Sequence, residues 1–249
     1  MTFSMTVLGC GTPYPRPDVA CSGYLLRADG VEVWVDAGPG TLANLQRYTR
    51  LDKLAAIWLS HLHIDHCNDL LPTYYALAYG GQAPPSPIPV FGPAGWVARM
   101  EGFLASARPE PLRTAFQPFE LTDGHQVAFG GLTLRSVAVE HGVPAFGLTA
   151  RYGERRLAYT GDSGPCDSLV TLAKGARVLV AEVGTDVIEI PSVHLAPEDA
   201  GITAAAAGVS RLVLTHLAPG LGDDEAVERA GSTFNGAIEI ARPGTLLEV

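Results

Sequence analysis

Three histidines and one aspartate lie close together directly after an apolar stretch of the chain. They are His61, His63, Asp65 and His66, in the segment IWLSHLHIDHCNDL that spans residues 57–70. In extended backbone, residues two apart point to the same side, so His61 and His63 can contact one metal ion. We expect Asp65 and His66 to open the helix that follows and to face a second ion. Imidazole and carboxylate ligands without thiolates are typical of zinc or a similar divalent metal.

A site for two ions needs more ligands than this segment supplies, and three further candidates each follow an apolar stretch. His141 follows LRSVAVE, Asp162 follows RLAYTG, and His216 follows LVLT. Functional groups often lie at the ends of strands, on loops held by a rigid scaffold, so we expect these residues to join the first four. Asp162 is the natural bridge, because one carboxylate has two oxygens and can contact two ions.

Short apolar stretches alternate with segments of helical character along the chain. Strands are predicted at residues 6–9, 23–27, 31–36, 55–60, 88–91, 132–139, 146–151, 156–160, 178–182 and 212–215. Helices are predicted at residues 40–49, 66–79, 94–107, 168–174, 197–207 and 223–230, and a surface loop at 80–89. Stretches such as VLVAE and LVLTH are continuously apolar, which indicates strands that are covered on both faces. The pattern predicts an α/β or α+β protein with a large sheet area.

The composition excludes several functional classes. The chain has 249 residues, and its 17 Lys and Arg against 26 Asp and Glu give a net charge of −9, which argues against stable binding to a nucleic-acid backbone. No apolar run is long enough for a membrane helix, and no signal peptide is visible. The four cysteines form no CxxC pattern, and the sequence assigns no chemistry to Cys10 or Cys21. We expect one cytoplasmic domain over residues 1–249, without a membrane partner.

The segment SHLHIDH resembles the HxHxDH motif of the metallo-β-lactamase superfamily. The later His141, the TGDS segment with Asp162 and the LTHL segment with His216 match the remaining metal motifs of that superfamily in order, and Asp36 in VWVDAGPG matches its early aspartate. The resemblance implies an αββα four-layer sandwich of the α+β class, in which two packed mixed β-sheets carry helices on both outer faces. It assigns the first ion to His61, His63 and His141, and the second to Asp65, His66 and His216, with Asp162 between them.

Within the superfamily, VLVAEVG and SVHLAPEDAG are similar to segments of the ribonuclease Z-like phosphodiesterase branch. That likeness implies two divalent ions, with zinc favoured and manganese or iron as alternatives, and no other cofactor. His194, polarised by Glu182, would give a proton to the leaving oxygen, while Asp65 would also steer the proton of a hydroxide that bridges the ions. The segments VLGCGTPYPRPDVACSGYLL, VDAGPGTLANLQR and LTHLAPG look closest to compact bacterial cyclic-nucleotide phosphodiesterases. The expected partner is therefore a small-molecule phosphodiester; the related family often dimerises, and a homodimer stays open.

Three other functions also stay open. A ribonuclease Z-like tRNA 3′ endonuclease is the first, but tRNA-processing members usually carry a long arm between the third histidine motif and the bridging aspartate. Only 20 residues separate His141 from Asp162, which is room for a hairpin. A lactonase or thioesterase on the same metals is the second. The third is a binding protein that holds metal without turnover. Against this alternative, every expected ligand position is occupied by a residue that can bind metal.

Overall fold

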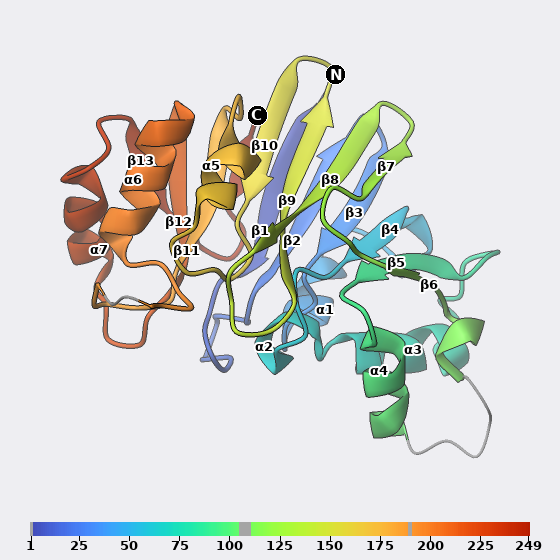
Figure 1. Cartoon of the computed structure of the whole chain (residues 1–249). Helices are drawn as coiled ribbons and strands as arrows, with labels where there is room; N and C mark the ends of the chain where they lie inside the picture. Colours follow the sequence, from blue (N-terminus) through green and yellow to red (C-terminus); the bar gives the residue numbers. More distant parts are fainter. Residues whose placement is uncertain (1, 105–110, 189–190) are drawn as a thin grey trace.

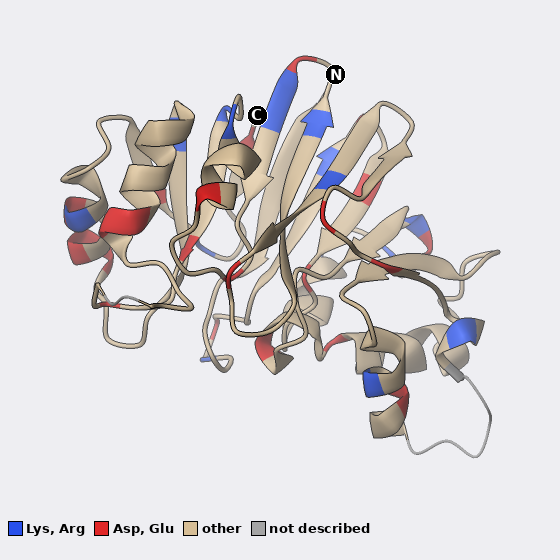
Figure 2. Ribbon diagram, viewed as in Figure 1, with Lys and Arg blue, Asp and Glu red and all other residues tan. Residues whose placement is uncertain are grey.

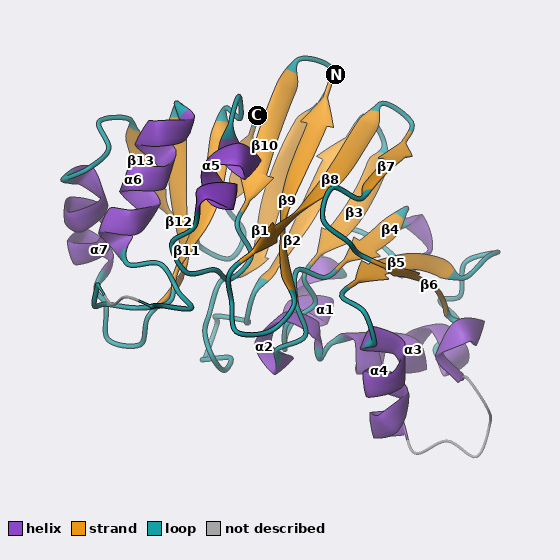
Figure 3. Ribbon diagram, viewed as in Figure 1, coloured by secondary structure: helices purple, strands orange, loops and turns teal. Residues whose placement is uncertain are grey.

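Two seven-stranded β-sheets pack face to face, and helices cover the outer face of each sheet (Figure 1). This computed structural model describes residues 2–104, 111–188 and 191–249. Figure 3 shows the helices gathered outside the strands, which makes the four-layer αββα arrangement visible. The sandwich predicted from the sequence is confirmed. None of the described helices is long and apolar enough to cross a membrane.

The first sheet has the strand order β14-β1-β2-β3-β4-β5-β6. Its strands are β1 (Phe3–Gly9), β2 (Gly23–Ala28), β3 (Val31–Val35), β4 (Ala56–Trp58), β5 (Ile88–Gly92), β6 (Phe116–Glu120) and β14 (Leu246–Glu248). The pairs from β14 to β3 are antiparallel, and the pairs from β3 to β6 are parallel. The carboxyl ends of β3 and β4 therefore lie at the same edge of this sheet.

The second sheet has the strand order β13-β12-β11-β10-β9-β8-β7. Its strands are β7 (Gln126–Phe129), β8 (Leu132–Val139), β9 (Ala145–Tyr152), β10 (Arg155–Tyr159), β11 (Val178–Val183), β12 (Arg211–Leu217) and β13 (Ala237–Ile240). The pairs from β7 to β10 are antiparallel, and those from β10 to β13 are parallel. The carboxyl ends of β10, β11 and β12 consequently share one edge.

Helices complete the outer layers. Those that pack on the first sheet are α1 (Thr41–Leu45), α3 (Leu70–Tyr79) and α4 (Trp96–Leu104). Those that pack on the second are α5 (Asp167–Ala173), α6 (Pro197–Ala207) and α7 (Asp223–Gly231). The short helix α2 (Ile64–Cys67) lies between β4 and α3 in the chain, and two 3₁₀ helices span Leu51–Lys53 and Pro111–Thr114.

The central strands are apolar on both faces because each face meets a different core. In β2, Leu26 belongs to the core between the sheets, while its neighbour Leu25 belongs to the core under the helices of the first sheet. Val180 and Leu179 of β11 divide in the same way between the inner core and the core under α5, α6 and α7. Successive side chains of a strand point to opposite faces, so continuous apolar runs are what two-sided burial requires.

The structure corrects several predicted elements. The helix predicted over 40–49 spans only Thr41–Leu45. The predicted helix over 66–79 is two helices, because the chain turns at Asp69, whose side chain accepts a 2.8 Å hydrogen bond from the backbone N–H of Leu42. The strands β6, β7, β13 and β14 were not predicted, and they are the four edge strands of the two sheets. Most of their residues are exposed or only partly buried, so these strands lack the apolar runs that mark central strands. Of the predicted helix over 94–107, residues 105–107 lie outside the described residues.

Candidate metal centre

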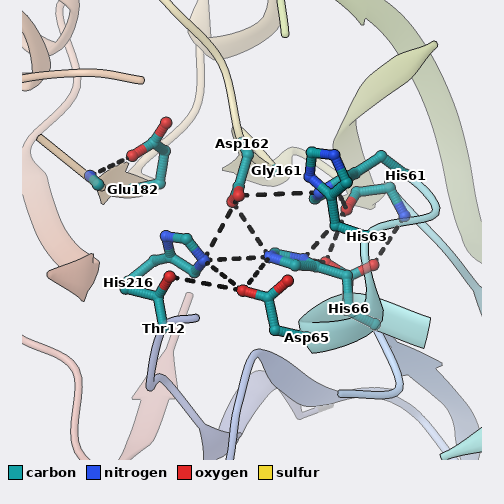
Figure 4. A network of polar contacts seen from close by, with 12 residues as sticks. Thr12, His61, His63, Asp65, His66, Gly161, Asp162, Glu182 and His216 are labelled. Atoms are coloured by element: carbon teal, nitrogen blue, oxygen red, sulfur yellow. Dashed lines mark hydrogen bonds and ion pairs between the residues drawn. The ribbon is translucent and has the colours of Figure 1, made fainter. Parts of the chain in front are cut away.

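The seven predicted metal ligands meet at one edge of the sandwich, where loops leave both sheets. Figure 4 labels all of them except His141. The first sheet supplies four of them: His61 and His63 in the loop after β4, and Asp65 and His66 in α2. The second sheet supplies three: His141 after β8, Asp162 after β10, and His216 near the end of β12. The fold thus brings together side chains as far apart in the sequence as Asp65 and His216, which lie 151 positions apart.

One group of ligand atoms comes from three histidines. His61, His63 and His141 each offer a ring nitrogen, and these nitrogens lie within 4.8 Å of one another. Nδ1 of His63 is 3.0 Å from Nε2 of His141. His61 and His141 are buried, while His63 is exposed. The group therefore has one open side.

A second group lies beside the first and includes a carboxylate. Nε2 of His216 is 3.2 Å from Nε2 of His66 and 3.2 Å from Oδ2 of Asp65. Thr12, in the loop after β1, donates a 3.4 Å hydrogen bond from its hydroxyl to the same Asp65 oxygen. Asp65, His66 and His216 are all buried, so this group is more enclosed than the first.

Asp162 lies between the two groups. Its Oδ1 is 3.2 Å from Nε2 of His66, and its Oδ2 is 3.4 Å from Nε2 of His216. The same Oδ2 is 3.8 Å from Nε2 of His61 and 3.9 Å from Nε2 of His141. Burial alone would raise the pKa of Asp162, but His216 and His66 bring that pKa well below its usual value. Asp162 is therefore a carboxylate within reach of both groups.

The donor set fits metal ions better than it fits a hydrogen-bonded cluster. Nε2 of His61 is buried and has no hydrogen-bond partner among the described residues. A buried nitrogen without a hydrogen-bond partner destabilises the folded protein unless a bound group, such as a metal ion, contacts it. Burial also lowers the pKa values of His61, His63 and His141, which favours the neutral imidazoles that bind metals. Nitrogen and oxygen donors that converge without thiolates suit zinc, manganese or iron.

Further hydrogen bonds orient the ligand rings. Asp36, after β3, accepts a 2.8 Å hydrogen bond from Nδ1 of His66, and the hydroxyl groups of Ser60 and Tyr159 donate to the same carboxylate at 2.8 and 2.7 Å. Nδ1 of His141 donates to the backbone carbonyl of Val193 at 2.7 Å. In both rings Nε2 is left facing the cluster, as in metal sites whose ligands are fixed from behind.

His194 and Glu182 form a pair at the border of the cluster. Glu182 is fully buried at the end of β11, and its Oε1 accepts a 3.0 Å hydrogen bond from Nδ1 of His194. The side chain of His194 is 28% exposed, and its ring stacks on that of His216 with 5.9 Å between centroids. Burial opposes protonation of His194, but Glu182 raises its pKa. The pair thus places a partly exposed, proton-bearing ring beside the buried ligands.

Several residues of this site could not be predicted from the sequence. Thr12, Ser60 and Tyr159 contact ligands or the aspartate behind them, but a lone hydroxyl residue near a strand end carries no motif. Asp36 and His216 both have left-handed backbone, with φ of 54° and 53°, a conformation that residues other than glycine rarely adopt. No sequence signal for that conformation was available.

Comparisons with known proteins agree with this geometry. Residues 32–217 match the family model described as the β-lactamase superfamily domain. The chain is 34% identical over 246 residues to the protein Rv1339 of Mycobacterium tuberculosis, which covers 96% of this chain and 89% of that protein. It is 32% identical over 277 residues to the ribonuclease Z of Mycobacterium marinum, which covers 99% of each chain.

A probable metallo-hydrolase of Bacillus subtilis, YhfI, resembles the chain in both sequence and structure. The two sequences are 29% identical over 252 residues, which covers 99% of this chain and all of YhfI. The crystal structure of YhfI matches over 100% of both chains with a TM-score of 0.89 and 26% identity. The sequence matches cover most of the chain, and the clustered His and Asp residues supply suitable ligands for a divalent metal. The chain therefore belongs to the β-lactamase superfamily, among the metal-dependent hydrolases related to YhfI and ribonuclease Z.

Proposed function

We propose that this protein is a phosphodiesterase with two metal ions and that it acts on small phosphodiesters, with cyclic nucleotides as the favoured class. The observation that carries this proposal is the His194–Glu182 pair, which borders two adjoining groups of metal ligands. Hydrolysis of a phosphodiester needs positive charge at the phosphoryl oxygens, which metal ions supply, and a proton for the leaving oxygen, which a histidine can supply.

The chain's own donors divide into two ligand sets around a shared carboxylate. The first ion would be held by His61, His63 and His141, the second by Asp65, His66 and His216, and both by Asp162. Zinc is favoured, and manganese or iron also suit these donors. Such ions supply an activated water and positive charge at the phosphoryl group. Thr12 donates to Oδ2 of Asp65, the oxygen that faces His216, and Asp65 would also orient the proton of the attacking water.

His194 is the proton donor in this proposal. Glu182 accepts the hydrogen bond from Nδ1, so the proton to be transferred is on Nε2. Three backbone N–H groups, from Ser163, Leu195 and Gly184, also donate to Glu182 and hold it in place. The raised pKa of His194 keeps a larger fraction of the ring protonated near neutral pH, as a general acid requires.

The chain between His141 and Asp162 favours a small substrate. The hairpin of β9 and β10 occupies most of this interval, and the paired strands leave only Gly153 and Glu154 as its turn. Figure 2 shows acidic and basic positions interspersed over the ribbon, in a chain with a net charge of −9. A polyanionic RNA would need a row of basic side chains along its path. Cleavage of RNA ends is the second candidate, because the likeness to ribonuclease Z covers 99% of both chains.

A substrate panel separates these functions. Metal-loaded protein is assayed with 2′,3′- and 3′,5′-cyclic nucleotides, bis(p-nitrophenyl) phosphate, a tRNA precursor, a lactone and a thioester, and the metals are identified by elemental analysis. We expect two ions per chain and the highest kcat/KM on a cyclic nucleotide. Preferred cleavage of the tRNA precursor, the lactone or the thioester would replace the proposed substrate class. Two bound metals without hydrolysis of any substrate would indicate a metal-holding binding protein.

A further inference from the structure

A cavity of about 400 Å³ lies apart from the metal ligands, between the loop after β1, helix α1 and the turn before β14. Leu8, Arg16, Arg47, Tyr48 and Gly244 are among the residues that line it, and neither the seven clustered residues nor His194 and Glu182 do so. Its volume lies within the range of about 300–1,000 Å³ that is usual for small-molecule sites. The cavity is therefore large enough for a ligand of its own.

The cavity walls carry two arginines without acidic partners. Among the described residues, neither Arg16 nor Arg47 forms a side-chain hydrogen bond or an ion pair, whereas Arg27, Arg211 and Arg229 each pair with a glutamate. Both arginines are exposed, so their guanidinium groups are free to meet a ligand that enters the cavity. A planar guanidinium group matches the oxygens of a phosphate group better than any other side chain does.

Other groups that line the cavity suit the remainder of an organic phosphate. Tyr48 is 40% exposed, and its aromatic ring could stack against a flat base. The carboxylate of Asp18 also lines the cavity and can accept hydrogen bonds from sugar hydroxyls. Gly244 has a φ of 90°, and a Cβ atom there would lie 3.4 Å from the Tyr48 hydroxyl, so the absence of a side chain keeps this wall open.

The loop that lines the cavity also reaches the metal ligands. Thr12 donates to Asp65, and the carbonyl of Cys10 accepts a 3.2 Å hydrogen bond from the backbone N–H of His216. Arg16 lies a few residues further along the same loop, where its backbone N–H and carbonyl pair with those of Val19. A ligand held by Arg16 would thus contact the loop whose Thr12 and Cys10 form hydrogen bonds with Asp65 and His216.

We propose that this cavity is a binding site for a nucleotide-sized organic phosphate, separate from the metal centre, with Arg16 and Arg47 as the groups that bind the phosphate. The site does not depend on the reaction that the metal centre catalyses.

The test uses adenosine 5′-monophosphate as the probe and metal-loaded protein throughout. Calorimetry compares the wild type with the Arg16→Gln/Arg47→Gln double variant and with Arg177→Gln, a control in an exposed arginine just before β11, whose side chain does not line the cavity. We expect the double variant to bind the probe at least tenfold more weakly at the cavity and the control to match the wild type. Adenosine, which lacks the phosphate, is expected not to bind there. Thermal melts of all three proteins check that they are folded.

A crystal structure of the metal-loaded wild type with the same probe gives the location directly. Phosphate density in contact with Arg16 and Arg47 supports the proposal, whether or not a second molecule occupies the metal centre. Density at the metals alone would overturn the proposal, as would an affinity that the double substitution leaves unchanged. Because binding is measured rather than turnover, a failed phosphodiesterase assay leaves this test intact.

Discussion

The carboxylate of Asp36 accepts a hydrogen bond of 2.8 Å from Nδ1 of His66, so only Nε2 of that ring is free to face the ligand cluster. Both side chains are fully buried. The same carboxylate accepts hydrogen bonds from the backbone N–H and the hydroxyl of Ser60, at 2.7 and 2.8 Å. Asp36 is not one of the clustered ligands, but it thus orients the ring of His66 and the loop that carries His61.

This relationship predicts that Asp36→Asn weakens metal binding without removing a ligand. The amide has only one oxygen to accept the four hydrogen bonds that reach Asp36, so His66 loses its fixed orientation. Comparable changes behind metal ligands typically cost about 10–100-fold in metal affinity. Competitive titration with a chelator measures the affinity, and Ser168→Ala on α5 serves as a conservative control. Wild-type affinity in Asp36→Asn would show that the orienting role is wrong.

Substitution of the ligands themselves predicts a graded loss of metal. His63→Ala removes one nitrogen from the first group, whereas Asp162→Ala removes the carboxylate that contacts both groups. We expect elemental analysis to find the larger loss in Asp162→Ala, with activity falling in parallel in each variant. Equal metal content in the two variants would mean that Asp162 does not bridge.

His194→Ala is predicted to separate metal binding from turnover. Nδ1 of His194 is hydrogen-bonded to Glu182, and the ring lies at the exposed border of the cluster. Loss of the His194 side chain should therefore leave both ions in place. If it acts as a general acid, kcat should fall by roughly 10²–10⁴. Glu182→Gln should give a smaller decrease, since the ring remains. Substrates with a leaving group that needs no proton, such as p-nitrophenolate, should be much less affected by His194→Ala. A parallel loss of metal would instead identify His194 as a ligand.

Asp69 predicts a pH-dependent contribution to stability that is independent of catalysis. Burial raises the pKa of Asp69 to about 6, although the backbone N–H groups of residues 40–42 offset part of that increase. A carboxyl group with a raised folded-state pKa contributes its full stabilisation at pH values below its unfolded-state pKa, about 4, and loses that contribution as the pH rises through about 6.

The Asp69→Asn variant isolates this contribution. Its amide cannot ionise, and its oxygen can still accept the hydrogen bond from the N–H of Leu42. The free energy of unfolding of the wild type, minus that of the variant, should therefore decrease between pH 4 and 7, by up to about 3 kcal/mol. Urea unfolding at several pH values measures this difference, in which the other titrating groups cancel. Parallel stability curves would show that Asp69 titrates normally.

The convergence of the seven candidate ligands could be predicted from the sequence because each is a His or Asp at or shortly after the end of an apolar strand, and the fold brings such positions to one edge. Asp65 and His66 were expected to open a helix, and they lie in α2. The roles of Thr12, Ser60 and Tyr159 could not be predicted, because they arise only from contacts between distant segments. The four edge strands could not be predicted because most of their residues are exposed or only partly buried, which leaves no continuous apolar pattern.

The ligand cluster draws its members from both β-sheets. His61, His63, Asp65 and His66 follow β4 of one layer, while His141, Asp162 and His216 follow or end strands of the other. Bound ions would therefore link the two β-sheets, and the sheets could not separate without releasing the ions. Resistance to proteases that attack partly opened molecules should then rise with the concentration of free metal, even in a variant that no longer turns over substrate.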